Sequence, residues 1–270
     1  MTNQRFSDAE ALIYDQGMDD WPGEIDFYKK FANAAKEKGQ SVLDIACGTG
    51  RVTLRLAQTG AHVVGLDLAA DMLAIAQQKA QGLQNVRWVE GDMRSFDLGE
   101  RFGLVIIPVH SFQFMLTPQD QVECLQCIRR HLLPGGLLII HNNNEEIDWL
   151  GDIQSTQKPP FEVGKIFIHT QTRAKIRPLN RWIYSTATQT CTQYKVWEEL
   201  GEGDATIRRH EFEPMPMHTI FPFEMEHLLY RIGLEVITIY GDFNGHPFAD
   251  DSRDAIWLVR EPESKQKQET

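Results

Sequence analysis

The sequence predicts an α/β fold built on a doubly wound parallel sheet. Strand-like and helix-like segments alternate from residue 41 to about residue 140. That order is typical of parallel strands in one sheet with helices on both faces. The strand-like segments are also near-continuous apolar runs, as expected for strands that are covered on both faces.

The elements can be assigned in order along the chain. Residues 21–39 predict a helix before the first strand, within an N-terminal helical segment, 1–40. Five strands are expected at 41–47, 62–67, 86–90, 103–109 and 137–141, and helices are expected from Arg51, over 70–80 and over 119–133. Pro134, Gly135 and Gly136 are predicted to break the chain before the fifth strand.

Residues 143–221 do not show this alternation of strand-like and helix-like segments. Polar and apolar residues alternate over long stretches, and the turn-forming runs RPLN and GEGD separate them. This pattern predicts an antiparallel β insertion of three or four strands after the fifth strand. At that place in the chain it would stand over the carboxyl edge of the sheet, where open α/β folds bind ligands. We therefore expect a lid or substrate platform, with an oligomer surface as the alternative.

The βα pattern returns at the C-terminal end. Residues 223–243 predict a helix, a cap at Gly233 and a strand, and residues 254–260 predict the last strand. The segment 222–260 is thus expected to complete the core, whereas the polar tail 261–270 is expected to be disordered.

Bulk properties exclude some partners. The 270 residues are 42% hydrophobic and carry 27 basic against 38 acidic side chains, a formal net charge of −11. Broad nucleic-acid contact needs a basic face, so no nucleic-acid partner is expected. No apolar run reaches membrane-spanning length, and the polar start MTNQRFSDAE lacks a signal core. We therefore expect no membrane contact and a cytoplasmic location.

The segment VLDIACGTG, residues 42–50, is the most informative part of the chain. It predicts a buried strand, a glycine-rich turn and a helix start, where backbone N–H groups are free to bind a ligand. A dinucleotide fingerprint would need a third glycine where this chain has Thr53. Asp44, at the carboxyl end of the strand, is placed to face a cationic ligand instead.

The pattern DxxxGxG from Asp44 to Gly50 resembles motif I of the class I S-adenosylmethionine-dependent methyltransferases. This resemblance implies a seven-stranded, Rossmann-like methyltransferase sheet whose terminal hairpin ends in an antiparallel strand. It also implies S-adenosylmethionine as the cofactor, held by a core over residues 41–142. Ala46 is a departure, because many members of the family have glycine there.

Two further segments support an adenosyl ligand. Asp67 ends the second strand, where an acid can accept hydrogen bonds from two ribose hydroxyls; capping the next helix is its alternative role. Residues 91–96, GDMRSF, resemble the family segment in which an acid takes the adenine amino group. The cofactor-binding residues implied in this way are Asp44, Ala46, Cys47, Gly48, Gly50, Asp67, Leu68, Met72, Asp92, Met93 and Val109.

Four residues are candidates for the catalytic step. His110 follows the fourth strand, whose end lies beside the transferred methyl in methyltransferases. The segment around it lacks the N/D-P-P-Y/F pattern of the nucleic-acid amino-methyltransferases. His141, His218 and Tyr14 are further candidates; Tyr14 resembles a tyrosine that small-molecule methyltransferases fold over the cofactor. A hydrogen-bonded loop or strand residue is the alternative interpretation of each.

The sequence thus predicts an enzyme that moves a methyl group from S-adenosylmethionine to a nitrogen or oxygen of a small molecule by in-line displacement. The segment after the insertion loosely resembles N-methyltransferases that act on amino-sugars. A methyltransferase for protein or another macromolecule, and a non-catalytic regulatory module that binds the cofactor, are the alternatives. We expect a monomer or a homodimer.

No metal is expected from the cysteines. Cys124 and Cys127 form a CxxC pair inside a predicted helix, and no second pair or nearby histidine pair completes a zinc site. We therefore interpret both as small buried residues of the core.

Overall fold

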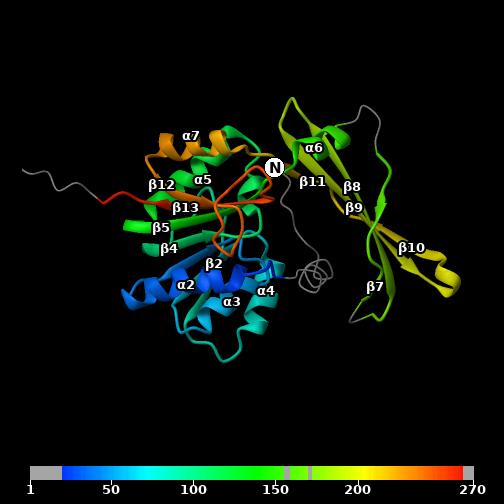
Figure 1. The fold of residues 1–270 in the computed structure, drawn as a ribbon. Coiled ribbons are helices and arrows are strands. Elements are labelled where there is room, and N and C mark those ends of the chain that lie inside the picture. The colour runs from blue at the N-terminus through cyan, green and yellow to red at the C-terminus, as the bar shows by residue number, and fades with distance from the viewer. Residues whose placement is uncertain (1–19, 155–158, 170–171, 264–270) are drawn as a thin grey trace, which may run out of the picture. The chain divides into compact units, whose positions relative to one another are not determined.

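The computed structural model describes residues 20–154, 159–169 and 172–263. These residues divide into two compact units (Figure 1). The first unit draws on residues 1–144 and 220–270, and the second comprises residues 145–219.

A seven-stranded sheet forms the centre of the first unit, with the order β12-β13-β5-β4-β1-β2-β3. The strands are β1 (Val42–Ile45), β2 (Val63–Asp67), β3 (Val86–Glu90), β4 (Phe102–Ile107), β5 (Leu132–Asn143), β12 (Glu235–Tyr240) and β13 (Asp254–Arg260). Neighbours from β1 to β5 pair in parallel, whereas β13 is antiparallel to both β5 and β12. The predicted doubly wound sheet and its antiparallel last strand are confirmed.

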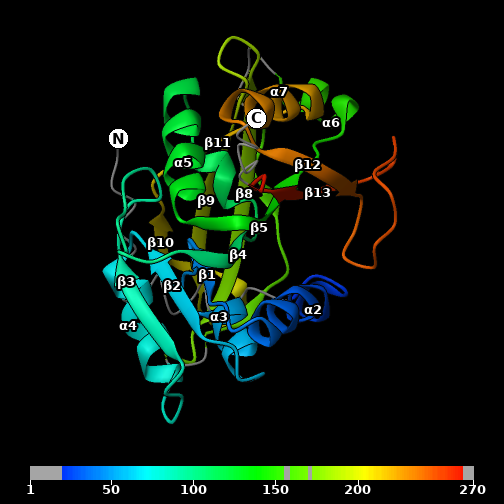
Figure 2. The same ribbon diagram turned by 90° about the vertical axis from the view of Figure 1, so that its left-hand side faces the viewer.

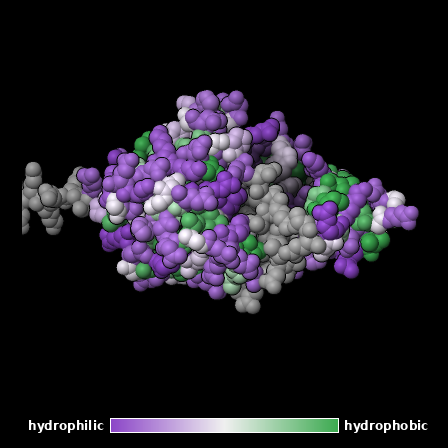
Figure 3. All heavy atoms as spheres, turned by 90° about the horizontal axis from the view of Figure 1, so that it is seen from below, coloured by the Kyte–Doolittle hydropathy of each residue, from purple (hydrophilic) through white to green (hydrophobic). Residues whose placement is uncertain are grey.

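Helices cover both faces of this sheet, as Figures 1 and 2 show. One face carries α2 (Glu24–Glu37), α3 (Arg51–Ala57) and α4 (Ala70–Lys79), and the other carries α5 (Pro118–Arg130) and α7 (Pro222–Ile232). Each face has its own cluster of buried apolar side chains, centred on α2 and α3 or on α5 and α7. Seen from the side of α2, α3 and α4, the surface of this unit is mainly hydrophilic (Figure 3).

Glycines make room for one large side chain on this sheet. Gly65 on β2 and Gly50 at the start of α3 both face the indole of Trp88 on β3. A Cβ at either position would lie 2.6 Å from that ring. Trp88 can therefore lie against β2 only because these two residues have no side chain.

The second unit is an antiparallel sheet. Its strands are β6 (Glu162–Val163), β7 (Phe167–Ile168), β8 (Lys175–Ser185), β9 (Thr190–Leu200), β10 (Thr206–Glu211) and β11 (Met215–His218). The segment also contains α6 (Ile147–Ile153) and a 3₁₀ turn, η2 (Glu202–Asp204). The expected strand number was too low and α6 was not predicted, because two-residue strands and a seven-residue helix are too short for a clear periodicity.

Three predicted boundaries are wrong. Residues 177–180, expected as a turn, lie inside β8, where Pro178 pairs with Trp197 on β9. Pro134–Gly136 lies inside β5, whose pairing with β4 shifts register there. The tail does not begin at Glu261, because its N–H donates to the Gly136 carbonyl and its carboxylate pairs with Arg129. Among the helices of the described ranges, none is long and apolar enough to cross a bilayer.

Candidate active site

The glycine-rich loop after β1 adopts left-handed backbone conformations. Ala46, Gly48 and Gly50 have φ angles of 56°, 54° and 78°, and Gly50 is the N-cap of α3. Glycine adopts such angles freely, whereas a residue with a Cβ does so at a cost. This conformation gives a physical reason for the glycine that the resemblance to motif I leads us to expect at position 46. Cys47, between these residues, is buried, and burial raises the pKa of its thiol well above the usual value.

Asp44 is a fully buried carboxylate with one unpaired oxygen. Its Oδ2 accepts a hydrogen bond of 2.5 Å from the hydroxyl of Thr53, the residue in place of the third glycine of a dinucleotide motif. Its Oδ1 has no hydrogen-bond partner among the described residues. Burial raises the pKa of Asp44 to about 7. A buried carboxylate oxygen without a partner is costly, and a cationic ligand would compensate it.

Asp67 ties the end of β2 to the glycine-rich loop. Its Oδ2 accepts from the Gly48 N–H at 2.7 Å, and its Oδ1 accepts from the Ala69 N–H at 2.8 Å. The N-cap of α4 is Ala69, without a side-chain cap, so Asp67 does not fill that alternative role. The Leu68 N–H also hydrogen-bonds this carboxylate, and the acceptor capacity that remains could serve a ribose hydroxyl. Nearby Leu68 is 47% exposed and Met72 is buried.

Asp92 is held in an ion-pair network that the sequence did not reveal. Its carboxylate receives both backbone and guanidinium N–H groups of Arg94. The same guanidinium donates to Asp120 on α5 at 2.6 Å. The hydrogen bonds from Arg94 lower the pKa of Asp92. An adenine amino group at this place would therefore meet an ionised carboxylate that Arg94 already orients. The neighbouring Met93 is partly buried and packs against the apolar core.

Three polar side chains converge where β4, β5 and β13 meet. His110 Nε2 lies 3.2 Å from His141 Nε2, and His141 Nε2 lies 2.8 Å from Asp254 Oδ1. The third separation, from His110 Nε2 to Asp254 Oδ1, is 3.6 Å. We call these three residues the histidine–aspartate cluster. His141, the last residue of the strand expected over 137–141, is fully buried within β5, which continues to Asn143.

The backbone presents His110 to this cluster. Val109 and His110 both have positive φ, 55° and 60°, and the His110 N–H donates to the His141 carbonyl at 3.0 Å. Positive φ is rare for a β-branched residue such as Val109, and strained backbone of this kind persists where surrounding contacts impose it. Val109, which the resemblance implies as a cofactor residue, directly precedes His110 in the chain.

The electrostatics of the cluster are set by burial and by the short contacts. Burial lowers the pKa of His141, so its imidazole is neutral near pH 7. Burial alone would raise the pKa of Asp254, but hydrogen bonds from His110 and His141 outweigh it and the net shift is downward. The cluster therefore pairs an ionised carboxylate with imidazoles at one buried point.

Trp21 links the cluster to the helix after the glycine-rich loop. Its ring packs edge-on against His110 and His141, with centroids 5.5 and 5.6 Å away. The Arg51 guanidinium lies 5.9 Å from the Trp21 ring and pairs with the buried Glu24. Neither Trp21 nor Asp254 was predicted as a site residue. Asp254 begins β13, which runs antiparallel to β5, so Asp254 lies opposite Asn143 at the carboxyl end of β5.

Two other predicted catalytic residues belong to different parts of the chain. His218 ends β11 in the second unit, where it is buried. Tyr14 lies outside the described residues.

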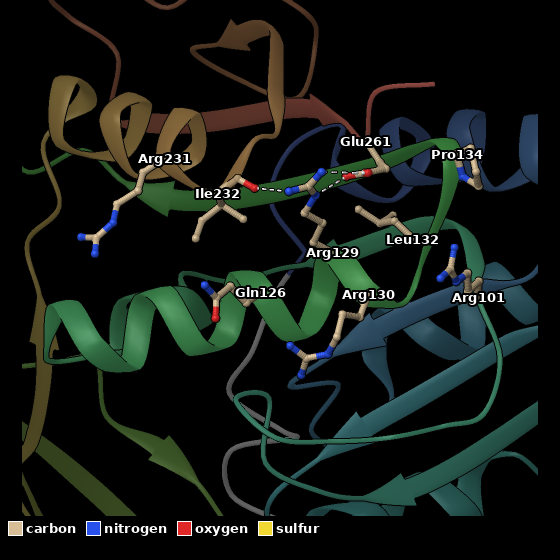
Figure 4. Close-up of a pocket in the computed structure, with 9 residues that line it drawn as sticks. All are labelled: Arg101, Gln126, Arg129, Arg130, Leu132, Pro134, Arg231, Ile232 and Glu261. Atoms are coloured by element: carbon tan, nitrogen blue, oxygen red, sulfur yellow. Dashed lines mark hydrogen bonds and ion pairs between the residues drawn. The ribbon is translucent and has the colours of Figure 1, made fainter. Parts of the chain in front are cut away.

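A separate hollow of about 480 Å³ lies at the opposite edge of the sheet (Figure 4). Its arginines do not converge on one point. Arg129 points to Glu261 and to the Ile232 carbonyl, while Arg101 and Arg231 lie at opposite ends of the view. The convergent polar groups of the first unit are those at the carboxyl edge, beside the glycine-rich loop.

The strand order, the left-handed loop after β1 and the acid that ends β2 together define a class I S-adenosylmethionine-dependent methyltransferase. Comparison with known proteins agrees: a family model described as "Methyltransferase domain" matches residues 42–136. The dTDP-4-amino-2,3,4,6-tetradeoxy-D-glucose N,N-dimethyltransferase of Saccharopolyspora spinosa is 33% identical over 223 residues, 81% of this chain and 83% of that protein. The chain belongs to the S-adenosylmethionine-dependent methyltransferase family, and its cofactor is S-adenosylmethionine.

Two other comparisons differ in their coverage. A relative from Bacillus subtilis (strain 168) is 35% identical over 130 residues, which span 48% of this chain and only 52% of that protein. The solved structure of the CcbJ methyltransferase from Streptomyces caelestis matches with a TM-score of 0.78 and 23% identity, over 97% of this chain and 100% of that one. This likeness shows that the fold extends over both units.

The residues at the loop fit this cofactor. The unpaired Oδ1 of Asp44 suits an ammonium group, because a buried carboxylate oxygen without a partner favours a cation. The remaining acceptor capacity of Asp67 suits a ribose hydroxyl.

Proposed function

We propose that the protein methylates a nitrogen atom of a small molecule, with His110 as the proton acceptor. The observation that carries this proposal is the histidine–aspartate cluster, at the same edge of the sheet as the glycine-rich loop. The relative from Saccharopolyspora spinosa, named as an N,N-dimethyltransferase of an amino-sugar nucleotide, supports a nitrogen acceptor.

The chemistry divides between cofactor and protein. S-adenosylmethionine, when bound, supplies a methyl group already activated by a positively charged sulfur, for in-line displacement. The protein then has to align the acceptor and remove its proton. Asp44, Ala46, Cys47, Gly48, Gly50, Asp67, Leu68, Met72, Asp92, Met93 and Val109 are the residues that we propose hold the cofactor.

The acceptor's proton explains why a base is needed. An alkyl amine is largely protonated at neutral pH and has no lone pair for attack until that proton leaves. His110 Nε2 faces His141 and Asp254, so a ring proton on Nε2 leaves a lone pair on Nδ1. No described residue hydrogen-bonds Nδ1. Proton transfer from the amine to Nδ1 gives an imidazolium, which the Asp254 carboxylate stabilises.

The test is the pH dependence of turnover in His110→Ala. We expect turnover at pH 7 to fall on the order of 10²-fold, while affinity for S-adenosylmethionine, measured by calorimetry, stays within a few-fold. The loss should shrink as pH approaches the pKa of the acceptor amine, because solvent then removes the proton. An unchanged rate would exclude His110 from the reaction, and an equal loss at every pH would exclude a role as base.

An oxygen acceptor is the second candidate, because a hydroxyl needs a base even more than an amine does. The imidazole pair of His110 and His141 favours this possibility. A turnover screen of amines, phenols and carboxylates, with mass spectrometry of the products, separates the two. Methylation of peptides or larger substrates alone would instead indicate a macromolecular acceptor.

A further inference from the structure

The histidine–aspartate cluster brings together three atoms that each offer a lone pair. Both imidazoles present the same ring nitrogen, Nε2, and the carboxylate presents Oδ1. The three separations are 2.8, 3.2 and 3.6 Å. Among the described residues, this is a group whose donor atoms could together hold a metal ion.

This arrangement differs from a proton relay. In a relay, the middle imidazole uses its two different nitrogens, one toward the carboxylate and one toward the group that gains the proton. Here His141 directs Nε2 toward both His110 and Asp254, and its Nδ1 has no hydrogen-bond partner among the described residues. One proton on His141 Nε2 cannot serve both neighbours, so a cation at the centre would satisfy all three atoms.

The dimensions suit a transition-metal ion. Zinc binds histidine nitrogen and carboxylate oxygen at about 2.0–2.2 Å, so neighbouring ligands in a tetrahedral site lie about 3.3 Å apart. The three observed separations bracket that value. Two imidazoles and a carboxylate suit zinc, iron, nickel or copper, whereas magnesium and calcium prefer oxygen ligands alone.

We infer that His110, His141 and Asp254 form a binding site for one zinc-class divalent cation. Three ligands leave a fourth position for water or another donor. The side chains of His110 and Asp254 are 17% and 19% exposed, so an ion can reach the buried His141 from their side. The left-handed backbone at Val109 and His110 fixes one ligand before any ion arrives.

Occupancy of this site would control the proposed reaction, a consequence that rests on the proposed function. A neutral imidazole that binds metal through Nε2 carries its proton on Nδ1. His110 would then have no lone pair for the acceptor's proton. A bound cation and base catalysis by His110 therefore exclude each other, and the ion acts as an inhibitor.

Metal binding can be measured without turnover. The full chain, free of any histidine tag and treated with a chelator, is titrated with Zn²⁺ by calorimetry and with Co²⁺ by visible absorption. We expect one ion per chain, visible Co²⁺ bands of a low-symmetry site, and no comparable binding of Mg²⁺. The described cysteines are all buried, so their thiols do not offer an accessible competing site.

Variants assign the ion to the cluster. His110→Ala and Asp254→Asn should each weaken Zn²⁺ binding on the order of 10²-fold, and circular dichroism checks that they fold. His246→Ala is the matched control, because His246 and Asp242 form an exposed histidine–carboxylate pair, 2.7 Å apart, that is not part of the cluster. Unchanged affinity in both cluster variants, or no stoichiometric binding by the wild-type protein, would overturn the site.

Turnover assays then separate this inference from the proposed function. With an active acceptor, Zn²⁺ should inhibit the wild-type protein and the His246→Ala variant at concentrations that match the calorimetric affinity. Binding without methylation of any amine would sink the proposed function alone. Methylation that depends on His110 but without metal binding would sink the metal site alone.

Discussion

Asp44 gives the chain a specific pH signature. Its pKa of about 7 in the folded state exceeds the value of about 3.9 for an unfolded aspartate. Between these values the unfolded state binds fewer protons than the folded state, so the free energy of unfolding falls as pH rises from about 4 to about 7. Above that range the penalty from Asp44 is complete and constant.

Asp44→Asn should therefore become more stabilising, relative to wild type, as pH rises through this range. Urea unfolding at pH 5, 6, 7 and 8 measures the difference directly. The same variant should bind S-adenosylmethionine more weakly, because its amide cannot neutralise an ammonium group. A stability difference that does not vary with pH would contradict a raised pKa for the buried Asp44 carboxyl.

At the residue scale, the sequence located the ends of the strands better than the contacts made there. Asp44, Asp67 and His110 were singled out because each lies in or shortly after the carboxyl end of an apolar strand. Trp21 and Asp254 were not, because their contacts join segments far apart in the chain. The His141–Asp254 hydrogen bond spans 113 residues, and no local spacing encodes it. The hydrogen bond from Thr53 to Asp44 was also not predicted. In the sequence, Thr53 was informative only because it stands where a dinucleotide-binding motif would have its third glycine.

Among the elements, the contact between β2 and β3 is sensitive to a small change. A Cβ on Gly65 would lie 2.6 Å from the Trp88 ring and 2.9 Å from Cys47 Sγ. Gly65→Ala should lower the free energy of unfolding by about 1–3 kcal/mol, the usual cost of overfilling a packed site. Chemical denaturation measures the loss.

Two further variants control this prediction. Gly151→Ala in α6 should show no loss, because a Cβ there has no atom within 4 Å and alanine favours a helix over glycine. Trp88→Leu in the Gly65→Ala background should recover part of the stability by removing the ring. An additive loss in the double variant would show that the ring is not the cause.

At the element scale, prediction succeeded where a strand is covered on both faces and mainly apolar. Both β1 and β4 are buried along their entire length, as their sequences required. It failed at β8, where Pro178 was taken for a turn residue although its carbonyl accepts from the Gly164 N–H and it pairs within the strand. It also missed α6, because seven residues give too few turns for a periodic pattern.

At the scale of the whole molecule, the two units differ in the functions that we propose for them. Every proposed cofactor residue belongs to the first unit, and both of its large apolar clusters are built from its own residues. We propose that residues 145–219 serve the acceptor. Replacing them by a glycine–serine linker should leave affinity for S-adenosylmethionine within about ten-fold by calorimetry and abolish methyl transfer.

The alternative role for this segment, an oligomer surface, has its own readout. Native mass spectrometry of the full chain and of the shortened chain reports any change in subunit number. Methyl transfer at the full rate by the shortened chain would contradict an acceptor role. The sequence could place this segment in the chain and predict its antiparallel character, but its alternating pattern carries no residue spacing that specifies a ligand.

The reversed direction of β13 has a consequence for how the protein is made. Ribosomes deliver the chain from its N-terminus, so the loop after β1, His110 and His141 all emerge well before Asp254. Until the last strand inserts beside β5, the two imidazoles lack their carboxylate. A chain released early, before residue 254, would therefore carry the cofactor loop without a complete cluster. The cluster can therefore be completed only after synthesis has passed residue 254.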